Sequence, residues 1–141
     1  MKASLAPGVT RTSKLTVDRD RTIGFMGENA RVYATPMLVR DIEVACRELL
    51  LAHLDPGEDS VGTRVEIDHV GATLLGMRVE LTLRVAEVSG RAVVFEVEGR
   101  DAVEPIVRGR HSRFVVDVAK TAQRLAAKAE KARQAQPAAG G

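Results

Sequence analysis

One long helix followed by strand-like segments is the feature that most restricts the fold of this chain. Residues 37–54 contain no Gly or Pro, and Thr35-Pro36 before them is a typical helix start. We predict a helix from Pro36 to Leu54, with Thr35 as its N-cap and Asp55-Pro56-Gly57 ending it. Asp41 is expected to lie on its polar side. Its apolar side is expected to contain Val39, Ile42, Cys46, Leu49, Leu50 and His53.

After the helix, the apolar residues repeat with a period of two, which is the period of strands. Apolar and polar residues alternate over residues 61–69, 77–85 and 93–97, and a looser strand is expected over residues 106–118. The turns between these segments are short, and Ser89-Gly90 has the composition of a hairpin turn. Such strands pair antiparallel, and the single helix must cover their apolar face. The fold class is therefore α+β.

The segments outside this unit have weaker patterns. Residues 10–18 are a weaker strand candidate, and residues 19–34 have no clear period and are expected to form a loop. An Ala-, Lys- and Arg-rich helix is expected over residues 119–134. We therefore expect one domain over residues 1–118, followed over residues 119–141 by a basic helix and a disordered tail.

Composition restricts the partners of the chain. Aromatic residues are 3% of the sequence and the net charge is +2 with mixed signs, so we expect no nucleic-acid partner. A single cysteine excludes an internal disulfide, and no long apolar run or signal-peptide core is present. We expect a cytoplasmic protein that does not enter a membrane. Three scattered histidines and the absence of a glycine-rich nucleotide motif predict neither a bound metal nor a cofactor.

Three polar residues of these elements could take part in chemistry. His69 ends the apolar row of the first long strand, so it is either a core histidine or a base that accepts a proton near neutral pH. Glu43 borders the apolar side of the helix. It either pairs with Arg47 one turn later, or its carboxylate faces a partly dry cleft, where it could orient His69, activate water or attack a carbonyl. Thr35 has a structural role as the predicted N-cap.

Spacing adds two further considerations. Gly62 within a strand indicates either a bulge or a backbone N–H that faces a developing negative charge on oxygen. Thr35 and Glu43 are eight residues apart, which is about 12 Å along a helix. One small substrate atom cannot contact both of them, unless the helix starts later than predicted or a partner subunit supplies one of the two.

Three segments resemble the fluoroacetyl-CoA thioesterase family of hotdog hydrolases. The first is Ala34-Thr35 with Glu43 to Cys46, the second runs from Leu54 through His69 to Gly76, and the third is Gly109-Arg110-His111-Ser112-Arg113. The resemblance covers residues 30–118. It implies a hotdog fold, in which an antiparallel sheet wraps around one long central helix. It also implies hydrolysis of a short-chain acyl-CoA thioester by a homodimer whose active sites lie at the subunit interface.

The resemblance also implies site roles. Thr35, Glu43 and His69 match the catalytic residues of the family, and Gly62 and Arg113 match substrate-binding positions. From the sequence alone, Arg113 could equally be an exposed strand arginine.

The sequence departs from the family pattern in two places, and these departures limit the family properties that are expected of this chain. Met26 and Asn29 stand where aromatic lid residues are expected, so fluoroacetyl selectivity is not predicted. Pro36 follows Thr35 where the family has glycine, and it could shift the Thr35 hydroxyl.

A non-catalytic hotdog module that binds an acyl-CoA remains the alternative function. A basic C-terminal arm for nucleic acid or CoA phosphates, and pairing of dimers into tetramers, also stay open.

Overall fold

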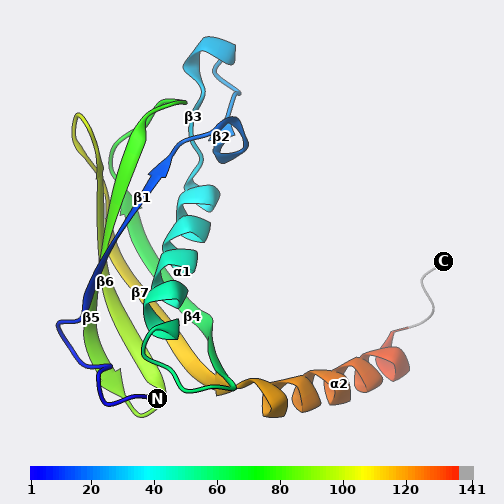
Figure 1. The fold of residues 1–141 in the computed structure, drawn as a ribbon. Coiled ribbons are helices and arrows are strands. Elements are labelled where there is room, and N and C mark those ends of the chain that lie inside the picture. The colour runs from blue at the N-terminus through cyan, green and yellow to red at the C-terminus, as the bar shows by residue number, and fades with distance from the viewer. Residues whose placement is uncertain (137–141) are drawn as a thin grey trace.

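A five-stranded antiparallel sheet curves around one long helix (Figure 1), as the period-two and helical patterns predict. The computed structural model describes residues 1–136. The spatial order of the strands is β1-β5-β6-β7-β4, so β1 and β4 form the two edges and β4 pairs with β7 rather than with β5. The five strands are β1 (Thr10–Thr16), β4 (Glu58–His69), β5 (Arg78–Ser89), β6 (Ala92–Asp101) and β7 (Pro105–Asp117).

The segment before the helix contains more structure than the predicted loop. Its two short strands pair with each other, and each is preceded by a single 3₁₀ turn. Leu74 forms an isolated bridge with Val32, so this segment also contacts the loop that follows β4. The four short elements are η1 (Arg19–Arg21), β2 (Thr22–Ile23), η2 (Glu28–Ala30) and β3 (Val32–Tyr33).

The helix α1 (Thr35–Leu51) confirms the predicted element but shifts both of its ends. Ala34 is the N-cap, without a side-chain cap bond, so the prediction that Thr35 caps the helix is wrong. The helix ends three residues before the predicted Leu54. Asp41 is only 9% exposed, which corrects its predicted polar-side position. The buried residues of α1 are Leu38, Asp41, Ile42, Ala45, Cys46, Leu49 and Leu50.

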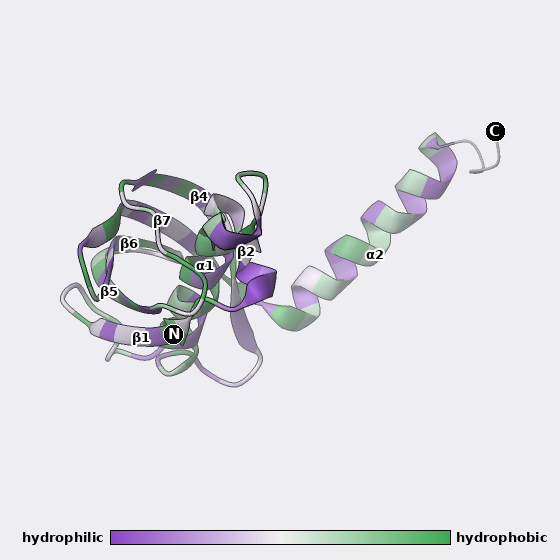
Figure 2. Ribbon diagram, turned by 90° about the horizontal axis from the view of Figure 1, so that it is seen from above, coloured by the Kyte–Doolittle hydropathy of each residue, from purple (hydrophilic) through white to green (hydrophobic). Residues whose placement is uncertain are grey.

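The core lies between α1 and the concave face of the sheet. Figure 2 shows the strands arranged around α1 when the molecule is viewed from above. Aliphatic side chains supply most of the buried surface, because Phe95 and Tyr33 are the only aromatic residues among the apolar side chains buried within residues 1–136. Leu81, Leu83 and Ile106 are completely buried against the helix side. Burial of such side chains is the main stabilising contribution to the fold.

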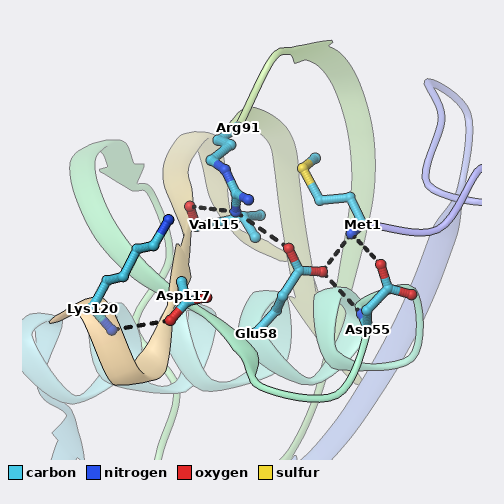
Figure 3. Close-up of polar contacts among 7 residues, drawn as sticks. All are labelled: Met1, Asp55, Glu58, Arg91, Val115, Asp117 and Lys120. Atoms are coloured by element: carbon cyan, nitrogen blue, oxygen red, sulfur yellow. Dashed lines mark hydrogen bonds and ion pairs between the residues drawn. The ribbon is translucent and has the colours of Figure 1, made fainter. Parts of the chain in front are cut away.

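Glu58 joins the loop after α1 to the hairpin between β5 and β6. Its carboxylate accepts hydrogen bonds from the Met1 ammonium, from the Asp55 backbone N–H at 3.0 Å and from Arg91 Nη1 at 3.2 Å (Figure 3). The bond with the Met1 ammonium is the largest cause of the lowered pKa of Glu58. These contacts fix the first residue of β4.

A helix at the C-terminal end projects away from the sheet (Figures 1 and 2). This helix, α2 (Val118–Ala135), confirms the predicted basic helix, and none of its residues is buried. Asp117 caps it by accepting a hydrogen bond from the Lys120 backbone N–H at 3.0 Å. The predicted disordered tail falls largely on residues 137–141, which lie outside the described residues. No helix within residues 1–136 is long and apolar enough to cross a membrane.

Gly109 on β7 has no room for a side chain beside the backbone of β4. A Cβ atom at this position would overlap the backbone carbonyl of Glu66 and approach Cα of Ile67 to 2.7 Å. Replacing Gly109 with alanine is therefore expected to lower the free energy of unfolding by about 2–3 kcal/mol. Gly90→Ala is the matched control, because Gly90 also has positive φ but an added Cβ meets nothing within 4 Å. Urea denaturation measures both, and equal losses would contradict the steric explanation.

Candidate active site

Thr35 and His69 meet where α1 begins and β4 ends. Thr35 Oγ1 lies 2.7 Å from His69 Nδ1, so the hydroxyl that the sequence assigns to helix capping instead binds an imidazole. The Tyr33 ring stands edge-on to His69, with centroids 6.4 Å apart and planes at 82°. These two contacts fix the position and the tilt of the imidazole ring.

The other imidazole nitrogen of His69 is available for chemistry. Nε2 is buried and has no hydrogen-bond partner within residues 1–136. Burial lowers the pKa of His69 below its usual 6.5, and a contact with the backbone of Gly71 partly opposes this shift. His69 is therefore neutral at pH 7, as a general base must be.

A buried polar network supports this end of the site. Asp41 accepts two hydrogen bonds from Arg21, from Nε at 2.9 Å and from Nη2 at 3.1 Å, and a third from the Tyr33 hydroxyl. Asp41 is on α1, whereas Arg21 and Tyr33 belong to the segment before it. The network therefore holds the ring that stands against His69. The sequence analysis missed it, because an acidic residue in an amphipathic helix is normally exposed.

An extra residue in β4 changes which side chains face α1. Gly62 pairs with Arg113, but Arg64 pairs with Ser112, so Thr63 is the additional residue of a β-bulge. This confirms the structural interpretation of Gly62 as the site of a bulge. Because opposed residues share a face of the sheet and Arg113 is buried, Gly62 faces α1.

The bulge lets Gly62 and His69 share one face although they are an odd number of positions apart in β4. Beyond the bulge, Val65 pairs with the buried His111, and the alternation from Val65 leads to His69 on the same face. The predicted inward row is therefore confirmed from Val65 onward. It is wrong at Val61, which is 45% exposed and lies on the outer face.

Glu43 forms a second polar group with Gly62. A Cβ on Gly62 would overlap Glu43 Oε1 and would approach His111 Cε1 to 3.2 Å and Arg113 Nη1 to 3.5 Å. The carboxylate therefore occupies the space that the missing side chain leaves. Arg113 is 5% exposed, so its interpretation as an exposed strand arginine is wrong. Arg113 donates from Nε to Ser60 Oγ at 2.8 Å and from Nη2 to the Ser60 carbonyl at 2.9 Å.

The predicted pair of Glu43 with Arg47 does not form. Arg47 instead makes two hydrogen bonds to Asp59 on β4, at 2.9 and 2.7 Å. Glu43 is consequently left to face Gly62. Cys46 lies nearby, but burial raises the pKa of its thiol to about 12, so it is not a thiolate at neutral pH.

The two groups are far apart within one chain. Gly62 and His69 are seven positions apart in β4, which corresponds to about 23 Å in a strand. Thr35 and Glu43 lie on the same helix, since α1 begins at Thr35, and they remain about 12 Å apart. One chain therefore brings together Thr35 with His69, and Glu43 with Gly62 and Arg113, but it does not join these two groups.

Comparison with known proteins adds an independent observation. A family model described as fluoroacetyl-CoA-specific thioesterase matches residues 17–119. The fluoroacetyl-CoA thioesterase of Streptantibioticus cattleyicolor is 31% identical over 127 residues, which cover 85% of this chain and 91% of that protein. The range matched by the family model includes the residues of both polar groups.

Solved structures agree with the fold. A structure of the fluoroacetyl-CoA thioesterase superposes with a TM-score of 0.80 at 28% identity, covering 94% of this chain and 98% of that one. A thioesterase superfamily member from Thermus thermophilus has a TM-score of 0.82, also at 28% identity and with the same coverage. A hot-dog-like protein from Thermanaerovibrio acidaminovorans has a TM-score of 0.80 at 25% identity, covering 86% of this chain and 91% of that one. The predicted hotdog fold is thus confirmed.

Proposed function

Because this chain belongs to the fluoroacetyl-CoA-specific thioesterase family, we propose that it hydrolyses a short-chain acyl-CoA thioester with Thr35, Glu43 and His69. The observation that carries the proposal is the Thr35–His69 pair, which leaves the buried Nε2 of a neutral imidazole without a hydrogen-bond partner among residues 1–136. Solved structures of the related thioesterase include complexes with acetyl-CoA and with fluoroacetate and CoA. A CoA thioester is therefore the substrate class that we propose for this chain.

The proposed reaction adds water across the thioester C–S bond. His69 Nε2 accepts a proton from water as its oxygen bonds to the carbonyl carbon, and the CoA sulfur leaves with its bonding electrons. The proton then passes to that sulfur, giving the free acid and CoA thiol. Thr35 holds Nδ1 and orients the ring. The Gly62 N–H and the Arg113 guanidinium are proposed to stabilise the negative charge that develops on the carbonyl oxygen.

Glu43 has two possible roles in this scheme. It could orient the attacking water, or it could attack the thioester carbon and form a mixed anhydride that water then cleaves. A single turnover in ¹⁸O-labelled water distinguishes them. Label found in the Glu43 carboxylate by mass spectrometry supports an anhydride that water cleaves at the Glu43 carbon. Label found only in the product acid, together with no acyl-enzyme trapped by hydroxylamine, supports direct attack by water.

A homodimer would bring the two polar groups together. The outer edge of β4 has no neighbouring strand within the described residues, and Val65 on its inner face is 38% exposed. Two copies of β4 can pair antiparallel about an axis at Glu66, so that Glu66 of each copy lies opposite the same residue of the other. Because Thr63 is the extra residue of the bulge, that register would place His69 opposite Gly62 of the partner subunit, and thus near the partner's Glu43.

Hydrolysis of a panel of acyl-CoA esters tests the function. Thiol release is measured for the wild-type protein and for the His69→Ala, Glu43→Ala double variant. Turnover above that of the double variant supports the proposal. Binding of a CoA ester that calorimetry detects and that leaves the ester intact would instead indicate the non-catalytic module, and the enzymatic proposal would be wrong.

The pH dependence of the reaction follows from the burial of His69. A base must be neutral, so kcat/KM is expected to fall as pH decreases through the pKa of His69. Burial lowers that pKa, so the acid limb should lie below pH 6.5. A pH–rate profile measures the limb, and NMR titration of the His69 ring, assigned with His69→Asn, identifies the group. A limb at or above 6.5 would contradict a desolvated base.

A further inference from the structure

His111 lies next to Gly62 and Arg113, and its two ring nitrogens have different partners. It is completely buried on β7, and its ring stacks on Phe95 with centroids 6.5 Å apart. Nδ1 lies 2.8 Å from the backbone carbonyl of Arg64, and Nε2 lies 3.2 Å from Arg113 Nη1.

These partners determine the protonation state of His111. A carbonyl oxygen can only accept a hydrogen bond, so Nδ1 carries the proton and donates a hydrogen bond to the backbone carbonyl of Arg64. A guanidinium can only donate, so Nε2 must offer a lone pair to Arg113. His111 is therefore the neutral Nδ1–H tautomer. Burial, which lowers its pKa, favours the same neutral form.

The acceptor at Nε2 holds Nη1, the last nitrogen of Arg113, at 3.2 Å. Nε and Nη2 of Arg113 are both bound to Ser60, which sets the plane of the guanidinium. One hydrogen of Nη1 goes to His111. The geometry of the amino group directs its other hydrogen away from His111, and a Cβ on Gly62 would lie 3.5 Å from this nitrogen. Glu43 Oε1 contacts the same point above Gly62.

We propose that His111 is a positioning residue that, as the neutral Nδ1–H tautomer, directs the Arg113 guanidinium toward Gly62 and Glu43. Its bond to Arg64 also spans the β-bulge, because Arg64 directly follows the inserted residue Thr63. The effect of His111 on turnover rests on the thioesterase function proposed above. Its effect on the geometry of Arg113 does not.

Two substitutions separate the two nitrogens. The amide of asparagine overlaps the position of Nδ1, so His111→Asn keeps the bond to the Arg64 carbonyl and loses the acceptor for Arg113. The amide of glutamine overlaps the position of Nε2, so His111→Gln keeps the acceptor and loses the bond to Arg64. Each variant loses one buried hydrogen bond, so both are expected to lose similar stability in urea.

The kinetic expectation differs between the variants. His111→Asn should lower kcat about 10- to 100-fold with little change in KM, because the interaction with developing charge is lost. His111→Gln should stay within about threefold of wild type in kcat, since Arg113 keeps its partner. In an Arg113→Ala background, His111→Asn should cause no further loss. Equal losses for Asn and Gln, or additive losses with Arg113→Ala, would overturn the proposal.

A measurement without substrate separates this inference from the function. The ¹⁵N and ¹³C shifts of the His111 ring in the wild-type protein report its tautomer at pH 7, and Nδ1–H is expected. The Nη1 protons of Arg113 should be protected from exchange in wild type and His111→Gln, and exposed to exchange in His111→Asn. An Nε2–H ring, an imidazolium, or Nη1 protection that does not depend on His111 would overturn the proposal, even in a protein that hydrolyses no CoA ester.

Discussion

In the proposed dimer, a heterodimer of His69→Ala and Glu43→Ala subunits is expected to recover the activity that each homodimer of the single variants loses. Each homodimer should lose about 10²–10⁴-fold in kcat/KM, since its sites lack either the base or the carboxylate. If His69 of one subunit acts with Glu43 of the partner subunit, the heterodimer has one site with both residues intact. It should then show about half of the wild-type activity per dimer. Two different affinity tags isolate the heterodimer for the assay.

The heterodimer with both substitutions on one subunit is the control. It pairs a wild-type subunit with a subunit that carries both substitutions, so it contains the same residues in a different arrangement. A site shared between subunits leaves it without an intact site, whereas a site within one chain leaves it with one. Activity in this control and none in the first heterodimer would show that the separation of Thr35–His69 from Glu43–Gly62 within the chain has been misinterpreted.

Removing the carboxylate of Asp41 is expected to cause the largest loss of stability. Asp41→Ala leaves Nε and Nη2 of Arg21 and the buried Tyr33 hydroxyl without their acceptor. Loss of one partner of a buried ion pair typically costs about 3–5 kcal/mol, because the remaining charge stays desolvated. Urea denaturation should show this loss in the free energy of unfolding with an unchanged dependence on denaturant.

Asp18→Ala is the matched control for this substitution. Asp18 binds the same guanidinium, with Oδ2 2.7 Å from Arg21 Nη1, but its side chain is 55% exposed. Asp18 also caps η1 by accepting a hydrogen bond from the Arg21 backbone N–H at 3.1 Å, so removal of this exposed partner should cost about 1 kcal/mol. Similar losses for the two variants would indicate that burial of Asp41 does not determine its contribution.

Regular periodicity was sufficient to predict the main elements. The helical spacing of Ile42, Cys46 and Leu49 and the alternation of Val93, Phe95 and Val97 follow directly from burial of one face, and all six side chains are buried. Such patterns are local, because each residue is compared only with its neighbours in the chain.

The errors arise where contacts join distant segments. Asp41 was assigned to the polar side of α1, but Arg21 and Tyr33 lie 20 and 8 residues earlier and remove it from water. Arg113 is buried because Ser60, 53 residues away, accepts its hydrogen bonds. Val61 was placed on the wrong face because alternation does not reveal the position of an inserted residue.

The candidate site could be predicted as residue types but not as an arrangement. Its five residues came from the family resemblance, and hydropathy alone left each of them a structural alternative. The capping alternative for Thr35 failed because its hydroxyl binds His69, and the pairing alternative for Glu43 failed because Arg47 binds Asp59. Neither outcome follows from local spacing, since each depends on the path of β4 beside α1.

The projecting helix α2 also determines the isoelectric behaviour of the protein. It contains five Lys and Arg residues and one Glu, whereas the whole chain has a net charge of +2, so the remaining residues carry a net charge of −2. Because no residue of α2 is buried, proteolytic cleavage just after Asp117 would remove this charge without opening the core. The trimmed protein would move from cation-exchange to anion-exchange resin at neutral pH, which gives a chromatographic signature of an intact C-terminal helix.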